Sequence, residues 1–473
     1  MTGQAQLFFG GRWVDGESTI VHKDKFDGHA VAEVHVASRQ QVSAATRAVA
    51  AEQEKRTLSP YDRFRILSGA SRMLEERSES FAQTIVDDSG LTITDARREV
   101  GRAVQTLLLC GEEAKRITGE VVPVSGAPGA TGRIGLTVRH PVGVVCAITP
   151  FNAPLNTVAH KVGPAIAAGN GVVLKPAAHT PLTSDRLVHL LLEAGLPAGL
   201  IALLQGPGST VGQWLLDDEV SSFYAFTGST EVGKHIHRTV GLRKTQLELG
   251  SLSSTIVCED ADLERAATLC VNAAFRKAGQ VCTSIQRLYV QRPAVDELLR
   301  LVAAQLDQRR SGDPRDDASF VGPLIATAEV DRVEEWVVQA VKAGASVAHG
   351  GRREGNVLEP TVLTDVSLEM DVMKREVFGP VVSLRPFDDL DEAIGEANAT
   401  PYGLAAGIFT ASIERALRAA ERLRVGSVHI NETSSSRLDL YPYGGVKLSG
   451  HGKEGPRYAI AEMTEERLVT IGA

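Results

Sequence analysis

Short apolar runs alternate with helix-like stretches over residues 142–248, and this alternation constrains the fold more than any other feature of the chain. The apolar runs are VGVVCAIT, GVVLKPA, LIALLQG, SSFYAFTG and KTQLELG, each of a length typical of a buried strand. The stretches between them, such as NTVAHKVGPAIAAG, are typical of helices. Strands joined by helical crossovers form a parallel sheet that is covered on both faces. The sequence therefore predicts a Rossmann-like α/β domain, in which ligands bind beyond the carboxyl ends of the strands.

A second alternating series starts at STIVCED and continues through SIQRLYVQ, PTVLTDV and FGPVVSLRPF to GSVHIN, which predicts a second α/β unit. Residues 117–140 hold two β-rich pieces around a Gly/Pro/Ala tip and predict a protruding hairpin. Residues 61–88 predict one amphipathic helix that ends at Gly90, and LFFGGRWVDG predicts a hairpin with a Gly-Gly turn. A length of 473 residues suits two or three domains of roughly 100–200 residues each.

Charge and cysteine content argue against several classes of function. The net charge is −8 and no basic block is present, so the sequence predicts no binding to nucleic acid or anionic membranes. No apolar run approaches the roughly 18 residues that span a bilayer, and the amino terminus lacks the features of a signal peptide. The five cysteines are widely spaced and form no CxxC pair, so we expect no disulfide framework, no metal site and a reducing, cytoplasmic setting.

One of these cysteines, Cys282, has neighbours that suit a reactive thiol. It lies in AGQVCTSIQ, between a helical stretch and a strand-like run, with Gly279 before it and Thr283 and Ser284 after it. Thiolate reactivity requires partial exposure and a nearby helix end or charge, and an open turn at this junction suits both. The ordinary interpretation, a small buried hydrophobe, suits the other four cysteines, which lie in apolar patterns.

Three further stretches carry polar groups that a thiol enzyme needs. In PFNAPLN, Asn152 follows an apolar strand, so it is either a turn residue or an amide that stabilises an oxyanion. In LELGS, Glu248 ends an apolar run, so it is either solvated at the strand end or a general base. In EVFGPV, Glu376 precedes an apolar turn and carries no signal alone.

Taken together, these stretches resemble the aldehyde dehydrogenase superfamily over essentially the whole chain. The matching motifs, in the family's order and close to its spacing, are PFNAPLN, KPAAHTP, FTGSTEVG, LELG, GQVCT, EVFGPV and PYGGVKLSGHGKEG. The resemblance implies an α/β fold with a Rossmann-like cofactor domain, an α/β catalytic domain and a β-ribbon oligomerisation arm. It also implies oxidation of an aldehyde to its carboxylic acid with NAD or NADP as cofactor.

The same resemblance implies a role for each matched residue. Cys282 is the nucleophile that adds to the aldehyde carbonyl, Asn152 and the Cys282 N–H hold the oxyanion, and Glu248 activates the water that hydrolyses the thioester. The residues implied to bind the cofactor are Phe151, Lys175, Ala178, Thr227, Gly228, Ser229, Leu249, Glu376 and Phe378. Ser229 resembles a serine that contacts the pyrophosphate at the start of a helix, where phosphate is favoured.

Two positions depart from the family's pattern. Many relatives that prefer NAD carry glutamate three residues after the lysine, where this chain has Ala178, so NADP is a plausible cofactor as well as NAD. The family usually has a second glycine where this chain has Ser251. Serine tolerates a positive φ poorly, so we expect the loop after Glu248 to be set differently.

The predicted substrate pocket contains His160, Val281, Ser284 and Arg437. His160 occupies a tunnel-lining position of the family, although packing within helix 156–168 is an equal alternative. The stretch SSSRLDLYPYGG, which contains Arg437, resembles branches of the family that oxidise small polar or anionic aldehydes, such as lactaldehyde, succinate semialdehyde or phosphonoacetaldehyde. Val281 and the apolar stretch TLLLC favour alkyl or aromatic chains instead, so a mixed pocket is expected for the aldehyde substrate.

The resemblance also divides the chain. We expect residues 1–116 and 141–248 to form the cofactor-binding domain, 249–461 the catalytic domain, and 117–140 with 462–473 the oligomerisation arm. An exposed β-ribbon offers an edge to a partner strand, so a homodimer or homotetramer is expected. Two alternatives remain: an enzyme of this fold that passes the acyl group to coenzyme A, against which Glu248 argues, and a non-catalytic binding protein, against which the retained Cys282 and Glu248 argue.

Overall fold

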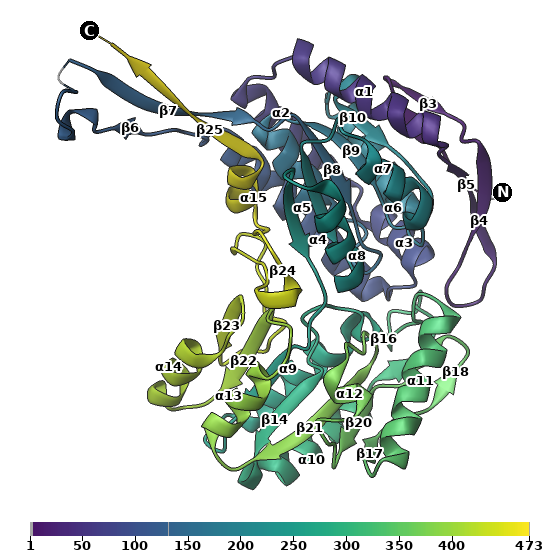
Figure 1. Ribbon diagram of the computed structural model, residues 1–473. Coiled ribbons are helices and arrows are strands. Elements are labelled where there is room, and N and C mark those ends of the chain that lie inside the picture. Colours follow the sequence, from purple (N-terminus) through teal and green to yellow (C-terminus); the bar gives the residue numbers. More distant parts are fainter. Residues whose placement is uncertain (1–2, 131, 473) are drawn as a thin grey trace.

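An eight-stranded sheet lies in the amino-terminal half of this computed structural model, which describes residues 3–130 and 132–472 (Figure 1). The strand order is β24-β12-β11-β8-β9-β10-β2-β3, and the strands from β12 to β10 are parallel. The parallel strands are β8 (Val144–Ile148), β9 (Gly171–Lys175), β10 (Ile201–Leu203), β11 (Phe223–Thr227) and β12 (Lys244–Glu248). They coincide with the five apolar runs, so the predicted parallel sheet is confirmed.

The two edges of this sheet are antiparallel. On one edge, β24 (Gly450–His451) pairs with the end of β12. On the other, the predicted hairpin is confirmed as β2 (Leu7–Phe9) and β3 (Arg12–Val14), which turn at Gly10 and Gly11 with φ of 60° and 79°. Such left-handed backbone is readily adopted only by glycine.

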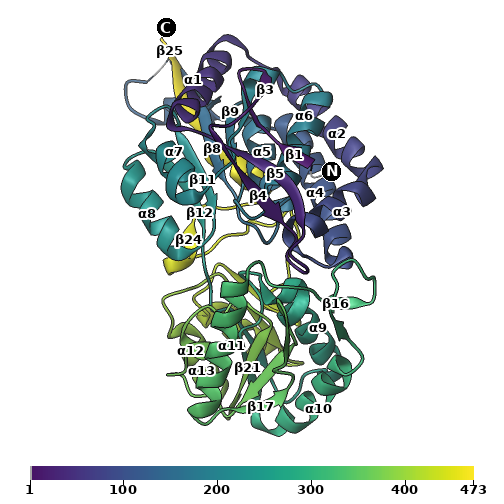
Figure 2. The same ribbon diagram turned by 90° about the vertical axis from the view of Figure 1, so that its right-hand side faces the viewer.

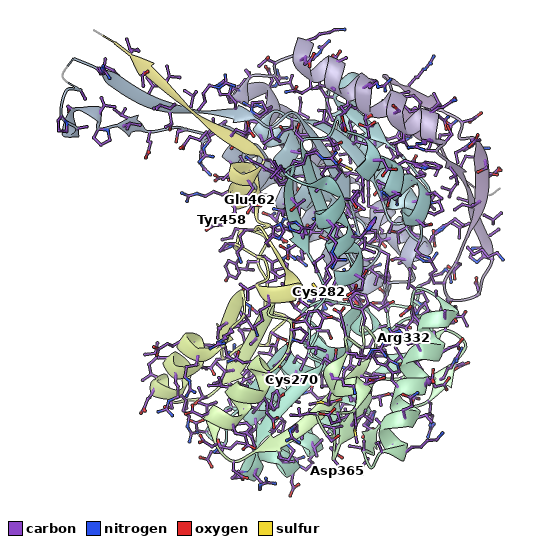
Figure 3. All side chains as sticks on the ribbon, viewed as in Figure 1. Cys270, Cys282, Arg332, Asp365, Tyr458 and Glu462 are labelled. Carbon is purple, nitrogen blue, oxygen red and sulfur yellow. The ribbon has the colours of Figure 1, made fainter. Side chains whose placement is uncertain are left out.

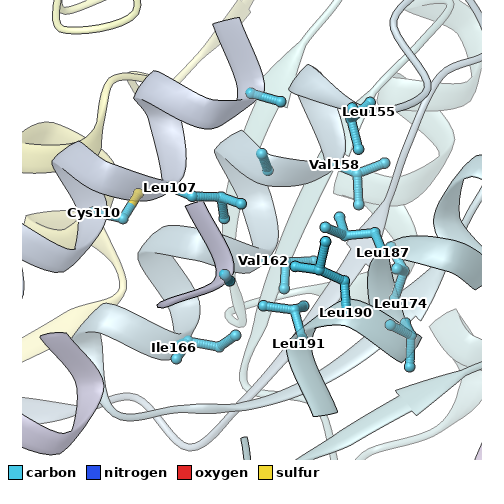
Figure 4. Close-up of a cluster of buried hydrophobic side chains, with 14 of the residues drawn as sticks. Leu107, Cys110, Leu155, Val158, Val162, Ile166, Leu174, Leu187, Leu190 and Leu191 are labelled. Carbon is cyan, nitrogen blue, oxygen red and sulfur yellow. The ribbon is translucent and has the colours of Figure 1, made fainter. Parts of the chain in front are cut away.

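Helices cover both faces of the sheet, because successive strand residues point to opposite sides. On one face, Val144 and Cys146 of β8 pack in a core with α1, α7 and α8, and on the other, Val145 and Ala147 pack in a core with α2 to α6. Figure 4 shows part of the second core, where Leu107 of α4 and Leu174 of β9 lie in one cluster with apolar side chains of α5 (Val158, Val162, Ile166) and α6 (Leu187, Leu190, Leu191). The helices are α1 (Arg39–Lys55), α2 (Pro60–Glu76), α3 (Ser78–Ser89), α4 (Ile93–Ala114), α5 (Asn156–Ala168), α6 (Pro181–Glu193), α7 (Gln213–Asp217) and α8 (Thr230–Val240).

The single helix predicted for residues 61–88 is wrong, because the segment forms two helices, α2 and α3. The break is at Arg77, whose backbone leaves the helical region at φ −108° and ψ 18°. The Arg77 guanidinium forms two hydrogen bonds with Glu193 of α6, at 2.6 and 2.7 Å. The predicted end at Gly90 is confirmed, since Gly90 caps α3 with φ 73°.

A seven-stranded sheet lies in the other half, and all its neighbours except β17 and β20 pair in parallel. Its order is β17-β20-β21-β14-β13-β22-β23, so the second predicted α/β unit is confirmed. The strands are β13 (Ser254–Val257), β14 (Arg287–Gln291), β17 (Ser346–His349), β20 (Thr361–Thr364), β21 (Val381–Phe387), β22 (Ala405–Phe409) and β23 (Ser427–Ile430). Its helices are α9 (Leu263–Phe275), α10 (Val295–Leu306), α11 (Thr327–Lys342), α12 (Asp371–Lys374), α13 (Leu390–Asn398) and α14 (Ile413–Arg422).

Three strands form a ribbon that projects from the molecule (Figure 1). The strand β7 (Ile134–Pro141) pairs with β6 (Val121–Val122) and, along its whole length, with β25 (Thr464–Ile471). Figure 2, turned by 90°, shows the carboxyl-terminal strand β25 rising beside the first sheet. The short helix α15 (Pro456–Glu462) precedes β25 and packs on α5.

The remaining strands form small sheets of two or three strands. A small sheet in the order β1-β5-β4 contains β1 (Gly3–Ala5), β4 (Ser18–Lys23) and β5 (Ala30–Val36). The two-stranded pairs are β15 (Arg310–Ser311) with β16 (Ser319–Val321) and β18 (Arg353–Glu354) with β19 (Val357–Leu358). Within the described residues, no helix has the length and apolar character needed to cross a bilayer.

The division into domains stays a prediction. Residues 1–2, 131 and 473 of the predicted ranges lie outside the described residues. The predicted catalytic domain includes residues 450–461. In the structure, however, β24 pairs with β12 of the first sheet and α15 packs on α5. The chain therefore returns to the first sheet before it enters the ribbon.

Candidate active site

Cys282 lies where the two halves of the molecule meet, as Figure 3 shows. A cavity of about 1270 Å³ opens at this junction and extends over the carboxyl ends of β8, β9, β11 and β12. Cys282, Glu248 and Asn152 all line it. Three residues far apart in the sequence are thus brought to one cavity.

The backbone before Cys282 is unusual. After α9, a 3₁₀ turn (Arg276–Gly279) carries three consecutive residues with positive φ: Lys277 at 53°, Ala278 at 53° and Gly279 at 69°. A Cβ on Gly279 would lie 2.0 Å from the carbonyl oxygen of Gly379, so only glycine fits there. Strained backbone of this kind persists only where the surroundings fix it. The turn presses the Cys282 loop against the loop that carries Glu376 and Phe378.

Lys277 fixes this turn to the first half of the molecule. Its backbone N–H donates to Asp95 Oδ2 at 2.8 Å, and its ammonium donates to the Asn152 carbonyl oxygen at 2.8 Å and to Glu99. The carboxylate of Glu99 also accepts the Leu155 N–H at 2.9 Å. The loops that carry Asn152 and Cys282 are therefore held together by one buried lysine.

Asn152 faces the Cys282 loop. Its amide nitrogen donates to the carbonyl oxygen of Gln280 at 2.7 Å, and the Gln280 side chain accepts the Ile325 N–H at 3.0 Å. In the described part of the chain, the Cys282 N–H has no hydrogen-bond acceptor. Two donors, one amide side chain and one backbone N–H, thus lie at the same loop, as an oxyanion hole requires.

The Cys282 thiol is partly buried, and its sulfur lies 3.0 Å from the Tyr443 hydroxyl. Burial raises the pKa of Cys282 to about 11, although Tyr443 and Arg437 act in the opposite direction. The other four cysteines are buried, and burial raises the pKa of each. Cys282 is the cysteine that lines the large cavity.

Glu248 is the last residue of β12, and only 3% of it is exposed. Neither carboxylate oxygen has a hydrogen-bond partner within the described residues. Burial, and then the nearby charge of Glu454, raise the pKa of Glu248 well above its usual value. A carboxylate with a raised pKa, open to a cavity and without a partner, suits proton transfer to or from water.

A network of charges closes the site behind Glu248. Glu454 lies 3.1 Å from the Lys161 ammonium and 2.6 Å from the Arg437 guanidinium. Although burial acts in the other direction, these two cations hold the pKa of Glu454 far below its usual value. Glu454 is therefore an anion between two cations, and Glu248 faces it from the cavity side.

All nine residues predicted to bind the cofactor line the large cavity. Ser229 caps the amino terminus of α8, where its hydroxyl accepts the Val232 N–H at 3.4 Å. Lys175 is buried, its ammonium donates to the Pro176 carbonyl at 2.8 Å, and burial lowers its pKa to about 8. The Phe151 and Phe378 rings meet edge to face with centroids 5.9 Å apart.

The cavity fits a dinucleotide in size and in chemistry. A helix amino terminus at Ser229 suits a pyrophosphate, and the Lys175 amine suits ribose hydroxyls. Glu376 accepts the Ser251 N–H at 2.9 Å through one oxygen, and burial raises its pKa to about 7. A Cβ on Gly250 would lie 2.5 Å from the other Glu376 oxygen, so the glycine leaves room for that carboxylate.

Ser251 causes no strain in the loop after Glu248. The described non-glycine residues with positive φ are Lys277, Ala278, Asp365, Phe378, Asn431 and Lys447, and Ser251 is not among them. Its hydroxyl lies 2.9 Å from the Ser253 hydroxyl, and its N–H binds Glu376. The sequence predicted that Ser251 would set this loop differently because serine disfavours a positive φ. Ser251 has no positive φ, so that reason does not apply here.

The four predicted substrate residues lie in different surroundings. His160 is buried in α5, and its Nε2 lies 2.8 Å from Asp439 Oδ1. The Arg437 guanidinium stacks on the Tyr443 ring, 3.8 Å from its centroid, and pairs with Glu454. Val281 and Ser284 line a small cavity beside Cys282, where the Ser284 hydroxyl donates to the Ala274 carbonyl at 2.9 Å. The substrate roles of these residues stay predictions.

Arg276 is a residue that motif matching did not identify. Its guanidinium donates to the Ser435 hydroxyl at 2.7 Å, and Ser435 lies 3.2 Å from the hydroxyl of Thr283, the residue after Cys282. Burial lowers the pKa of Arg276, whereas the charge of Asp95 acts in the opposite direction, as do those of Cys282 and Tyr443. No ion pair to Arg276 is found between residues that the structure describes. Its only signal in the sequence was a position six residues before Cys282.

Comparison with known proteins agrees with this geometry. Residues 13–469 match the aldehyde dehydrogenase family. The chain is 46% identical over 468 residues to the 3-sulfolactaldehyde dehydrogenase of Priestia aryabhattai, over 99% of this chain and 98% of that protein.

Two solved structures share the fold. Aldehyde dehydrogenase 21 from Physcomitrella patens, in complex with the reaction product succinate, has a TM-score of 0.97 and 35% identity, over 100% of this chain and 99% of that one. An NADP dependent enzyme from E. coli has a TM-score of 0.96 and 33% identity, over 100% of this chain and 98% of that one.

These matches do not favour a coenzyme A-acylating enzyme or a non-catalytic binding protein, since the chain resembles a 3-sulfolactaldehyde dehydrogenase, which is described as neither, over nearly its whole length. The chain belongs to the aldehyde dehydrogenase family, and it is an NAD(P)-dependent enzyme that oxidises an aldehyde to its carboxylic acid.

Proposed function

We propose that the substrate is a small aldehyde that carries a sulfonate or carboxylate a few atoms from the carbonyl. The observation that carries the proposal is Arg276, a partly buried cation close to Cys282 that has no ion pair within the described residues. A cation removed from water without a counter-ion is costly, and an anionic substrate supplies one. Arginine suits this task because its planar fork donates two parallel hydrogen bonds to such a group.

The comparisons support the same class of substrate. The relative from Priestia aryabhattai is a 3-sulfolactaldehyde dehydrogenase, and the structure from Physcomitrella patens holds succinate. Sulfolactaldehyde carries a sulfonate and succinate a second carboxylate. Arg437 is less suited to bind the substrate anion, because Glu454 already neutralises it at 2.6 Å. His160 is buried against Asp439, so it is less suited as well.

In the proposed mechanism, the Cys282 thiolate attacks the carbonyl carbon, and the Asn152 amide with the Cys282 N–H holds the resulting oxyanion. One such donor is worth about 2.7–4 kcal/mol of barrier. NAD(P), when bound, would accept the hydride that leaves the former carbonyl carbon as the C=O bond re-forms, so that a thioester remains on Cys282. Glu248 then takes a proton from the water that attacks the thioester, and the Cys282 thiolate leaves as the carboxylic acid forms. The oxygens of Glu248 without hydrogen-bond partners in the described chain support this role.

We also propose that the enzyme accepts NADP as well as NAD. Ala178 and His179 line the cavity three and four residues after Lys175, and neither brings a carboxylate that would repel a 2′-phosphate. The NADP dependent enzyme from E. coli, which shares the fold, supports the proposal that NADP is accepted.

The proposed assembly is a homodimer or homotetramer in the cytoplasm. The strand β25 pairs on one side with β7 and forms the edge of its sheet on the other. Leu468, Val469 and Ile471 on this strand are exposed, so a second ribbon would pair with the edge and cover apolar surface. The free state of all five cysteines supports a reducing compartment.

A substrate panel tests the proposal. Wild-type enzyme should oxidise sulfoacetaldehyde and succinate semialdehyde with a kcat/KM well above that for butanal. Arg276→Met should lower kcat/KM for the two anionic aldehydes by about ten- to hundredfold, the size of a charge-assisted hydrogen bond, and leave butanal unchanged. Arg292→Met is the matched control, since Arg292 forms an exposed ion pair with Asp388. Preference of the wild type for butanal, or equal losses on all three aldehydes, would refute the anionic substrate.

A further inference from the structure

The Tyr443 hydroxyl is the hydrogen-bond partner of the Cys282 sulfur among the described residues, at 3.0 Å. The proposed mechanism assigns it no role. Tyr443 is buried, with 6% of its surface exposed, and its backbone is fixed to that of Glu454 by two hydrogen bonds, at 2.7 and 3.2 Å. A buried phenol held this firmly beside a nucleophile is positioned to influence it.

The side chain of Arg437 also connects Tyr443 to Glu454. Its guanidinium stacks on the phenol ring, 3.8 Å from the centroid, and donates to Glu454 Oε2 at 2.6 Å. Each of Tyr443, Arg437 and Glu454 thus contacts the other two, through backbone hydrogen bonds, an ion pair and ring stacking. A cation over the ring face draws electron density from the phenol and makes its O–H a better donor.

We propose that Tyr443 is a catalytic residue whose hydroxyl donates a hydrogen bond to the Cys282 thiolate, and that Arg437 is the positioning residue that holds and polarises it. The proposal rests on Cys282 being the nucleophile. When the thiol ionises, its proton leaves to water, and the phenol keeps its own proton. The hydrogen bond then stabilises the sulfur anion until the C–S bond forms and that charge moves to the carbonyl oxygen.

The order of ionisation supports this direction of donation. Burial raises the pKa of both groups, but that of Tyr443 rises well above its usual value, whereas that of Cys282 rises to about 11. The thiol therefore ionises first, and a protonated phenol can only donate to it. The titratable or charged groups that act on the Cys282 sulfur are Tyr443, Arg437, Glu376, Glu248 and Arg276. Two of them, Glu376 and Glu248, are carboxyl groups that oppose the thiolate whenever they are ionised, so a neutral donor at 3.0 Å matters more.

Tyr443→Phe tests the proposal, because it removes one oxygen and keeps the ring on which Arg437 stacks. The measurement is the rate of Cys282 alkylation by iodoacetamide in the full-length enzyme, mapped by peptide mass, from neutral to mildly alkaline pH. The variant should react about ten- to hundredfold more slowly at each pH, because a hydrogen bond to a charged group of this strength shifts the pKa of the thiol upward by about one to two units. Loss of the hydroxyl opens space around the sulfur, so slower alkylation would not be steric.

Tyr289→Phe is the matched control, since Tyr289 is also buried and its hydroxyl has no hydrogen-bond partner in the described chain. It should alkylate at the wild-type rate. Arg437→Lys, which keeps a cation for Glu454 but loses the flat stacking surface, should slow alkylation less than Tyr443→Phe does. An unchanged Arg437→Lys would overturn the role of Arg437.

Unchanged or faster alkylation in Tyr443→Phe would overturn the role of Tyr443, because the phenol would then be neutral or would shield the thiol. Alkylation needs no aldehyde and no cofactor. Slower alkylation in an enzyme that oxidises no aldehyde of the panel would uphold the Tyr443 contact and refute only the proposed substrate class.

Discussion

The two sides of Cys282 are built in different ways. On the cofactor side, a cavity of about 1270 Å³ is lined by short contiguous motifs at the ends of parallel strands. On the other side, single charged residues from distant segments pair with one another: Lys161 and Arg437 with Glu454, and Arg102 with Asp439. The first side is determined by strand ends and can be recognised from motifs, whereas the second depends on tertiary contacts between residues up to 337 positions apart in the sequence. We infer that the first side carries the reaction common to the family and the second selects the aldehyde.

The largest expected effect is at the junction of the two sides. Cys282→Ala should reduce formation of NAD(P)H by at least about 10⁴-fold, because no other cysteine lies at the cavity and the covalent step is lost. The variant should still bind the cofactor, as measured by fluorescence quenching. Cys270→Ala, a buried thiol far from the cavity, is the control and should keep its activity. Substantial turnover in Cys282→Ala would show that the thiol is not the nucleophile.

Glu248→Gln should separate the two half-reactions. Acylation does not require the Glu248 carboxylate, but hydrolysis does, so rapid mixing should give a burst of NAD(P)H followed by a steady state slower by about 10²–10⁴-fold. Glutamine has nearly the same shape, so the cavity should be unchanged. An equal loss in both phases would contradict a role confined to deacylation.

Lys161→Met tests whether the charge network behind Glu248 is chiefly structural. Removal of one partner from a buried ion pair costs about 3–5 kcal/mol, and the remaining Arg437 should keep the loss near the lower end of that range. The urea midpoint of unfolding measures it. Lys234→Met is the control, because Lys234 pairs with Glu231 on the surface and should contribute less than about 1 kcal/mol. Equal midpoints for the two variants would show that the buried network adds no stability.

The smallest expected effect is on the cofactor side. Ala178→Glu should raise the KM for NADP by about tenfold and change that for NAD little, since a new carboxylate would repel the 2′-phosphate at about 1 kcal/mol or more. Steady-state kinetics with both cofactors checks this. If wild type rejects NADP, the inference from Ala178 is wrong.

The sequence predicted the first sheet because its parallel strands are short runs, most of them apolar, that alternate with helix-like stretches. It missed β22, whose residues AAGIF carry too few β-branched side chains to stand out. It also missed the break at Arg77, because the apolar spacing continues through it.

The site divides in the same way. Residues in motifs, such as Glu248 and Ser229, could be named from the sequence because the strand and helix ends that hold them are local features. Arg276 lies outside the motifs, and Tyr443 lies within PYGGVKLSGHGKEG, but no local pattern showed that either approaches Cys282. Their approach depends on three consecutive left-handed residues and on a bridge between residues 443 and 454. Long-range geometry of this kind leaves no local pattern.

The most direct test of the account is to trap the acyl group on the enzyme. Glu248→Gln mixed with succinate semialdehyde and NADP, quenched in acid and digested, should yield the Cys282 peptide with the mass of a bound succinyl thioester. Little of this adduct should be found in wild-type enzyme, and none in Glu248→Gln that also carries Cys282→Ala. An adduct on another residue, or NADPH formation without any adduct, would contradict the assignment of Cys282 and Glu248.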